Sequence, residues 1–108
     1  MNIHLIGVPL DLGAGKRGTS LGPAAIRYAG MNLTPRLDEQ LSKLGHPLID
    51  EGNIPVLAFT FPPEDVGDAR LRYLKPITYT CRQLAAMVAR HCGPEDLPLV
   101  IGGDHSIA

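Results

Sequence analysis

Short apolar runs alternate with segments of helical periodicity along this chain, and the pattern predicts parallel strands joined by helices. The apolar, β-rich runs fall at residues 3–8, 47–50 and 97–101, the lengths expected of buried strands. The segments between them carry apolar residues at helical spacing. We therefore expect an α/β fold, with three layers α/β/α around a central parallel sheet that is truncated here to about three strands.

Two of the predicted helices have clear start and stop signals. The first is expected to begin at Gly22-Pro23, because proline is tolerated in the first turn, and to stop at Gly30. The last is expected to end at Gly93-Pro94. Its apolar stripe consists of Ile77, Cys81, Leu84, Ala85 and Val88.

A helix between these two is predicted from its own punctuation. Thr34 is expected to be the N-cap, with Pro35 at the first helical position and Gly45 as the stop. The expected apolar stripe is Leu37, Leu41 and Leu44. Residues 51–76, in contrast, contain several prolines and little periodicity, which is typical of a long irregular connection.

The composition is that of a globular protein and argues against several partners. Hydrophobic residues make up 44% of the 108 and charged residues 19%, and the net charge is −1 with Lys and Arg scattered along the chain. A nucleic-acid or anionic-membrane partner would require a basic patch. We therefore expect no nucleic-acid partner and no binding to an anionic membrane surface. We also expect no membrane span, because no apolar run approaches the roughly 18 residues that cross a bilayer.

The setting expected for this chain is the cytoplasm. The N-terminus lacks the basic region and the cleavage site of a signal peptide. Cys81 and Cys92 are too few for a disulfide scaffold and lack the spacing of metal ligands.

Glycines at positions 13, 15 and 18 match the dinucleotide-binding pattern G-x-G-x-x-G, but their context argues against a nucleotide cofactor. In that fingerprint the helix opens within the glycine turn, whereas here it is delayed to Pro23. Lys16 is followed by Arg17 rather than by Ser or Thr, so the segment is not a P-loop either. We interpret residues 10–21 as a turn beside the edge of the sheet, with Arg17 as a candidate partner of an anion or of the site residues.

The strongest chemical signal is Gly102-Gly103-Asp104-His105-Ser106, which follows the strand at 97–101. The carboxyl ends of parallel strands are where open α/β sheets bind ligands. Neutral imidazole is a common ligand of divalent metals, so His105 is a candidate metal ligand. Asp104 should point to the other side and support the site or bond the backbone. Ser106 is expected to cap the next helical turn.

The remaining polar candidates have simpler interpretations, and no catalytic base or nucleophile is assigned. His4, His46 and His91 are interpreted as structural residues. Arg27, in the first predicted helix, is interpreted as solvated or salt-bridged.

Near its start the chain carries the segment IGVPLDLG at residues 6–13, followed by RG at 17–18 and GPAAIR at 22–27, and it also carries VIGGDHS at residues 100–106. Taken together, these segments resemble the ureohydrolase (arginase/agmatinase) family. The first group is similar to the opening of that family, and VIGGDHS is similar to its first metal-binding motif. The resemblance covers essentially the whole chain, and the short spacing between 16–18 and 22–23 is more similar to arginases than to agmatinases.

The resemblance implies manganese-dependent hydrolysis of a small guanidine substrate, for an arginase L-arginine to L-ornithine and urea. Two Mn²⁺ ions at the carboxyl edge of the sheet would share a bridging water and lower its pKa, and the resulting hydroxide would attack the guanidinium carbon. The resemblance also implies a homo-oligomer. Of the family's metal ligands only His105 maps onto this chain, because the later Asp-x-His-x-Asp and Asp-x-Asp motifs have no counterpart.

We therefore interpret residues 1–108 as the N-terminal part of a single, incomplete ureohydrolase domain. By itself it is expected to be inactive, since one imidazole cannot hold two ions. An agmatinase or another ureohydrolase is the alternative enzyme. A non-catalytic fragment, whose exposed sheet edge would need a partner, is the alternative if the chain truly ends at 108.

Overall fold

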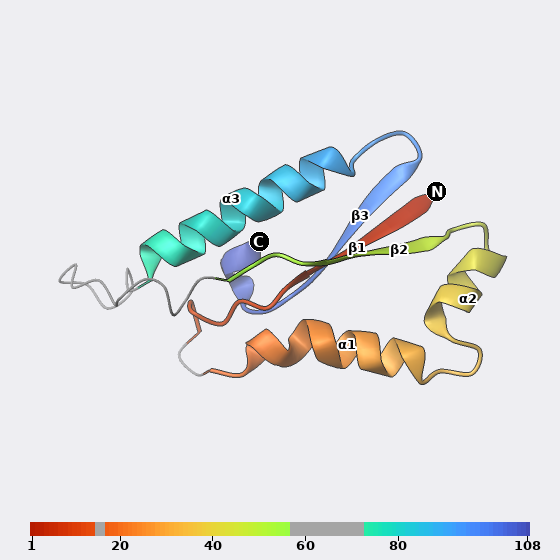
Figure 1. The fold of residues 1–108 in the computed structure, drawn as a ribbon, viewed down its shortest axis with the longest axis horizontal. Coiled ribbons are helices and arrows are strands. Elements are labelled where there is room, and N and C mark those ends of the chain that lie inside the picture. Colours follow the sequence, from red (N-terminus) through yellow and green to blue (C-terminus); the bar gives the residue numbers. More distant parts are fainter. Residues whose placement is uncertain (15–16, 57–72) are drawn as a thin grey trace.

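The computed structural model describes residues 1–14, 17–56 and 73–108, and its elements lie in three layers (Figure 1). Three parallel strands form the middle layer in the order β2-β1-β3. Helices α1 and α2 lie on one side of the sheet and α3 lies on the other. The predicted α/β/α fold with a short parallel sheet is confirmed. The bounds are β1 (Asn2–Val8), α1 (Gly22–Met31), α2 (Leu37–Lys43), β2 (Leu48–Asn53), α3 (Leu74–Arg90) and β3 (Asp96–Gly102), with short 3₁₀ turns η1 (Thr19–Leu21) and η3 (His105–Ile107).

The core lies between the central strand β1 and helix α3. Ile6 and Val8 point to this side and are fully buried, and Leu84 of α3 packs against them. Successive residues of a strand point to opposite faces, so Leu5 faces the other layer. The buried cluster consists of Ile6, Val8, Leu10, Leu12, Ile54 and Leu84.

The face of the sheet toward α1 and α2 is less completely filled. A groove of about 350 Å³ lies there, lined by side chains of both helices and of all three strands, among them Leu5 and Leu41. On β3, Leu97 and Leu99 remain 45% and 43% exposed. This layer therefore leaves apolar surface of the sheet in contact with solvent.

Arg27 ties α1 to β2. Its guanidinium donates two hydrogen bonds to the Asp50 carboxylate, from Nε at 2.8 Å and from a terminal nitrogen at 2.9 Å. It also donates to the Gly52 carbonyl and to the Asn53 side chain. The interpretation of Arg27 as a salt-bridged residue is confirmed. Strand β2 continues to Asn53, three residues beyond its predicted end at residue 50, because Asn53 still pairs with Gly7 of β1.

The predicted start of α2 is wrong. The N-cap is Arg36, not Thr34, and Pro35 precedes the helix. Arg36 has an extended backbone, and its N–H donates to the carboxylate of Glu39 at 3.3 Å, which is one of the two bonds of a capping box. The guanidinium of Arg36 has no acceptor atom with which to return the second bond. The expected stripe is also shorter than predicted, because Leu44 lies at the C-cap and is 71% exposed.

Helix α1 begins at Gly22 as predicted, but α1 and α3 both end away from the predicted glycines. Helix α1 continues through Gly30 to Met31, and the space that a Cβ would occupy at Gly30 lies against the Leu37 side chain. Helix α3 ends at Arg90, before Gly93. Much of the irregular connection predicted at 51–76 lies outside the described residues. None of the helices in the described ranges is long and apolar enough to cross a membrane.

The burial of Ile6 gives a stability prediction with a matched control. Ile6→Val should lower the free energy of unfolding by about 0.5–1.5 kcal/mol, because a methylene is removed from a fully buried side chain. Ile49→Val in β2, where the isoleucine is 40% exposed, should change it little. Urea unfolding should show a lower midpoint for Ile6→Val at unchanged slope. Equal effects at the two positions would contradict this description of the core.

Candidate functional site

The carboxyl end of β3 docks against the segment that follows β1. The Gly103 N–H donates to the Val8 carbonyl at 3.4 Å, and the Asp104 N–H donates to the Leu10 carbonyl at 2.8 Å. A Cβ at position 103 would collide with both carbonyl oxygens. Glycine is therefore required where the chain turns from the strand into the motif.

Asp104 uses both carboxylate oxygens to hold backbone. Oδ2 accepts from the Gly13 N–H and Oδ1 accepts from the Ser106 N–H, each at 2.8 Å. The predicted backbone bonds of Asp104 are therefore present. Ser106 is not the cap that was expected. Asp104 caps η3, because its extended backbone places the carboxylate over the Ser106 N–H.

His105 is the first residue of η3, and its side chain is exposed at the carboxyl edge of the sheet. The turn beneath it is anchored, since Ile107 packs on the core and the Cys81 thiol donates to the Ser106 carbonyl at 3.1 Å. Burial, together with the Asp104 charge, raises the pKa of that thiol. The fold thus fixes the backbone of the motif and leaves one imidazole open to a ligand.

The described part of the chain places no set of metal ligands around His105. Within residues 1–14, 17–56 and 73–108, no group of three His, Cys, Asp or Glu side chains with metal-ligand proximity includes His105. Its role as a metal ligand stays a prediction.

Arg17 is held by Asp11 at the start of the glycine-rich loop. Its Nε lies 2.7 Å from Asp11 Oδ1, and the Gly18 N–H donates to Asp11 Oδ2 at 3.0 Å. The Asp11 side chain is 4% exposed and that of Arg17 is 57% exposed. Burial alone would raise the pKa of Asp11, but the bonds from Arg17 and Gly18 outweigh it and lower the pKa. Among the described contacts, Arg17 pairs with Asp11 and not with Asp104 or His105.

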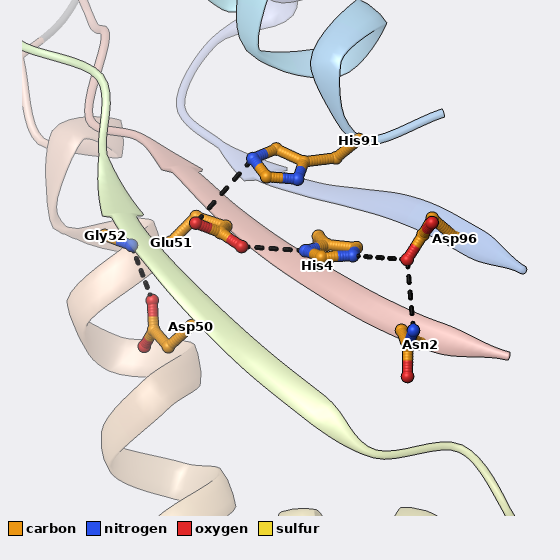
Figure 2. Close-up of polar contacts among 7 residues, drawn as sticks. All are labelled: Asn2, His4, Asp50, Glu51, Gly52, His91 and Asp96. Atoms are coloured by element: carbon orange, nitrogen blue, oxygen red, sulfur yellow. Dashed lines mark hydrogen bonds and ion pairs between the residues drawn. The ribbon is translucent and has the colours of Figure 1, made fainter. Parts of the chain in front are cut away.

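A second polar cluster lies on the face of the sheet that α3 covers, toward the amino ends of β1 and β3 (Figure 2). The His4 ring lies between two carboxylates, with Nδ1 2.7 Å from Glu51 Oε1 and Nε2 2.8 Å from Asp96 Oδ1. The His91 ring stacks on it with centroids 4.3 Å apart. The hydrogen bonds with Glu51, and then those with Asp96, raise the pKa of His4.

Sequence reasoning did not find this cluster. It treats His4 and His91 separately as structural residues, and their spacing in the chain gives no sign that they meet. They meet because β1 lies between β2 and β3 while the end of α3 returns over the same face of the sheet.

The sequence that carries these two docked motifs matches a known protein family. The model of the arginase family matches residues 1–108. The chain belongs to the arginase family. The predicted resemblance is thereby confirmed over the whole chain.

Individual arginases are similar in both sequence and structure. An arginase of Bacillus caldovelox is 43% identical over 106 residues, which are 98% of this chain and 33% of that protein. The structure of the native B. caldovelox arginase has a TM-score of 0.74 at 42% identity and matches 97% of this chain and 33% of that one. An arginase structure from Bacillus cereus also has a TM-score of 0.74, at 37% identity, covering 99% of this chain and 32% of that one. The chain spans about a third of the length of its arginase relatives.

For this arginase-family chain, the ion pair of Asp11 predicts a dependence of stability on pH. The pKa of Asp11 is lower in the folded than in the unfolded chain. The stabilisation is therefore fully present above the unfolded pKa of about 3.9, and it is lost as the pH falls through the folded pKa. Asp11→Asn should remove this part of the acid-side loss.

The measurement is the urea midpoint of wild type and Asp11→Asn between neutral and acidic pH. The control is Glu95→Gln, which changes an exposed carboxylate. Superimposable pH profiles for wild type and Asp11→Asn would show that Asp11 does not contribute in this way.

Proposed function

We propose that the protein to which these residues belong hydrolyses the guanidinium group of L-arginine to L-ornithine and urea, with manganese as cofactor. The observation that carries the proposal is the full-length match of the chain to the arginase family, with relatives named arginase at 34–43% identity. The docking of the 100–106 motif at a ligand-binding edge of the sheet supports it.

We further propose that residues 1–108 form the N-terminal part of a single ureohydrolase domain. The relatives are about three times as long as the matched region. The sheet supports the same view, because β3 pairs only with β1 among the described residues and its Leu97 and Leu99 are half-exposed. Parallel sheets are normally covered on both faces, so further elements of the fold would complete this layer.

The residues at the carboxyl edge fit a manganese site in part. His105 supplies one exposed imidazole, a donor that suits divalent manganese alongside carboxylates. Asp104 holds the Gly13 and Ser106 N–H groups with both oxygens, so its role is to fix the backbone on which His105 stands. The remaining ligands would come from outside these 108 residues, and the chain alone should be inactive.

When bound in such a site, manganese lowers the pKa of water and so supplies a nucleophile near neutral pH. The contribution of this chain to such a site is to hold the His105 side chain in position at the edge of the sheet. Gly103 lets the strand end pass under the carbonyls of Val8 and Leu10, and Asp104 fixes the turn that presents His105. Preorganised ligands of this kind are what a metal-assisted hydrolysis requires.

The alternative substrate is agmatine or another guanidine. The short spacing between 16–18 and 22–23 and the names of the relatives favour L-arginine. We also propose a cytoplasmic homo-oligomer. The two free thiols, Cys81 and Cys92, are compatible with a reducing compartment.

The first experiment assays the complete protein for urea release with Mn²⁺. We expect kcat/KM for L-arginine to exceed that for agmatine by at least about a hundredfold, because a site built for the charged α-amino acid group loses those bonds with agmatine. The reverse preference would assign an agmatinase. Absence of urea release from either substrate would reject the proposed function.

The second experiment replaces the proposed ligand. His105→Ala in the complete protein should lower bound manganese and activity together, by more than about a hundredfold, since even a residue that only supports a ligand contributes roughly 10–100-fold. His46→Ala, an exposed histidine far along the sheet, is the control. Arg17→Ala should reduce activity less and leave manganese content unchanged. Full metal content and activity in His105→Ala would exclude the ligand role.

A further inference from the structure

We propose that His4, Glu51 and His91 form a second cation site, specific for a divalent transition ion such as Zn²⁺ or Co²⁺, on the face of the sheet that α3 covers (Figure 2). The three side chains come from β1, β2 and the end of α3. Each offers one ligand atom, and these atoms all lie within 4.8 Å of one another.

The distances are close to those of a tetrahedral site. His4 Nδ1 lies 2.7 Å from Glu51 Oε1, and His91 Nε2 lies 3.7 Å from Glu51 Oε2. Metal bonds of about 2.0–2.2 Å place tetrahedral ligand atoms roughly 3.4 Å apart. A pair at the 4.8 Å limit must therefore close by about 1.4 Å, and the His4–Glu51 pair must open by about 0.7 Å. The His91 ring must also turn out of its 23° stack on His4. His91 is the C-cap residue, beyond the last helical turn of α3, which gives it that freedom.

A carboxylate behind His4 completes a pattern found at metal sites. His4 Nε2 lies 2.8 Å from Asp96 Oδ1, and the same oxygen accepts a hydrogen bond from the Asn2 side chain at 3.1 Å. A carboxylate on the far nitrogen fixes the tautomer of a ligating histidine and strengthens its basicity. Asp96 is thus a positioning residue that leaves Nδ1 of His4 for the metal.

The charge of the cluster also favours a divalent cation. Glu51 and Asp96 contribute two negative charges. Among the described residues, the two carboxylates form ion pairs only with His4 and His91. A divalent ion balances these charges when both imidazoles are neutral. Without metal, a proton on Nδ1 of His4 is held against Glu51. Metal binding replaces that proton, which leaves to solvent, while the Nε2 proton stays in its bond to Asp96.

The donor set decides the class of ion. Two imidazole nitrogens and one carboxylate oxygen suit Zn²⁺ and Co²⁺ better than Mg²⁺ or Ca²⁺, which prefer oxygen ligands. Three protein ligands leave a fourth position for water. The side chains of His4, Glu51 and His91 are 10%, 23% and 18% exposed, so the cluster is shielded yet lies at the surface.

This site is separate from the one at His105. His4 pairs with Pro98 of β3, whereas His105 follows the end of that strand at Gly102. The four residue steps from Pro98 to Gly102, at about 3.3 Å each, separate the two sites by roughly 13 Å or more along the sheet. The inference therefore stands or falls independently of the proposed function.

The test titrates the metal-free 108-residue chain with Co²⁺ and follows its visible absorption, and Zn²⁺ is then added as competitor. We expect one equivalent of Co²⁺ to give the intense bands of a four-coordinate ion, which Zn²⁺ abolishes. His91→Gln should lose these bands, and Asp96→Asn should weaken binding by about 10–100-fold. His46→Gln is the matched control and should bind as wild type.

Two controls separate loss of the proposed site from unfolding and from binding at His105. His91→Gln leaves the contacts of His4 with Glu51 and Asp96 in place, and circular dichroism and the urea midpoint confirm its fold. Every titration is repeated in a His105→Gln background, so that binding at the carboxyl edge is excluded. Retention of the bands in His91→Gln, or no binding by folded wild type, would overturn the proposal. Loss of binding in His105→Gln alone would assign the ion to the other site.

Discussion

The position of His105 depends on two backbone hydrogen bonds that the end of β3 makes to the segment after β1. The N–H groups of Gly103 and Asp104 reach the carbonyls of Val8 and Leu10, and only glycine fits at the first of these positions. The Asp104 carboxylate then holds the loop at Gly13. The two segments that carry the family resemblance, 6–13 and 100–106, are therefore the two segments that dock on each other, although about ninety residues separate them.

The elements that could be predicted from sequence are those specified by local pattern. The apolar runs of β1 and β3 and the stripe of α3 identify their elements because burial on one face imposes a period of two or 3.6 residues. Ile6, Val8 and Leu84 are buried as these periods require. The role of Asp104 could also be anticipated, since a short acidic side chain after a strand commonly bonds nearby backbone N–H groups.

What could not be predicted depends on particular contacts, most of them between distant segments. The start of α2 coincides with the hydrogen bond from the Arg36 N–H to the Glu39 carboxylate rather than with the usual threonine cap. The extension of β2 follows from the pairing of Asn53 with Gly7 of β1. The meeting of His4, Glu51 and His91 requires the strand order β2-β1-β3 and the length of α3, and neither is encoded in their spacing.

The two polar sites of the sheet differ in how their polar groups are satisfied, and this difference bears on both proposals. At the carboxyl edge Asp104 gives both oxygens to backbone N–H groups, so one exposed imidazole is what this segment offers to a metal. The proposed manganese site would therefore need donors beyond those that the described residues place beside His105. On the face of the sheet that α3 covers, imidazoles and a carboxylate from β1, β2 and the end of α3 already face one another. The first proposal therefore depends on further donors, whereas the second depends on side chains that the fold of this chain already brings together.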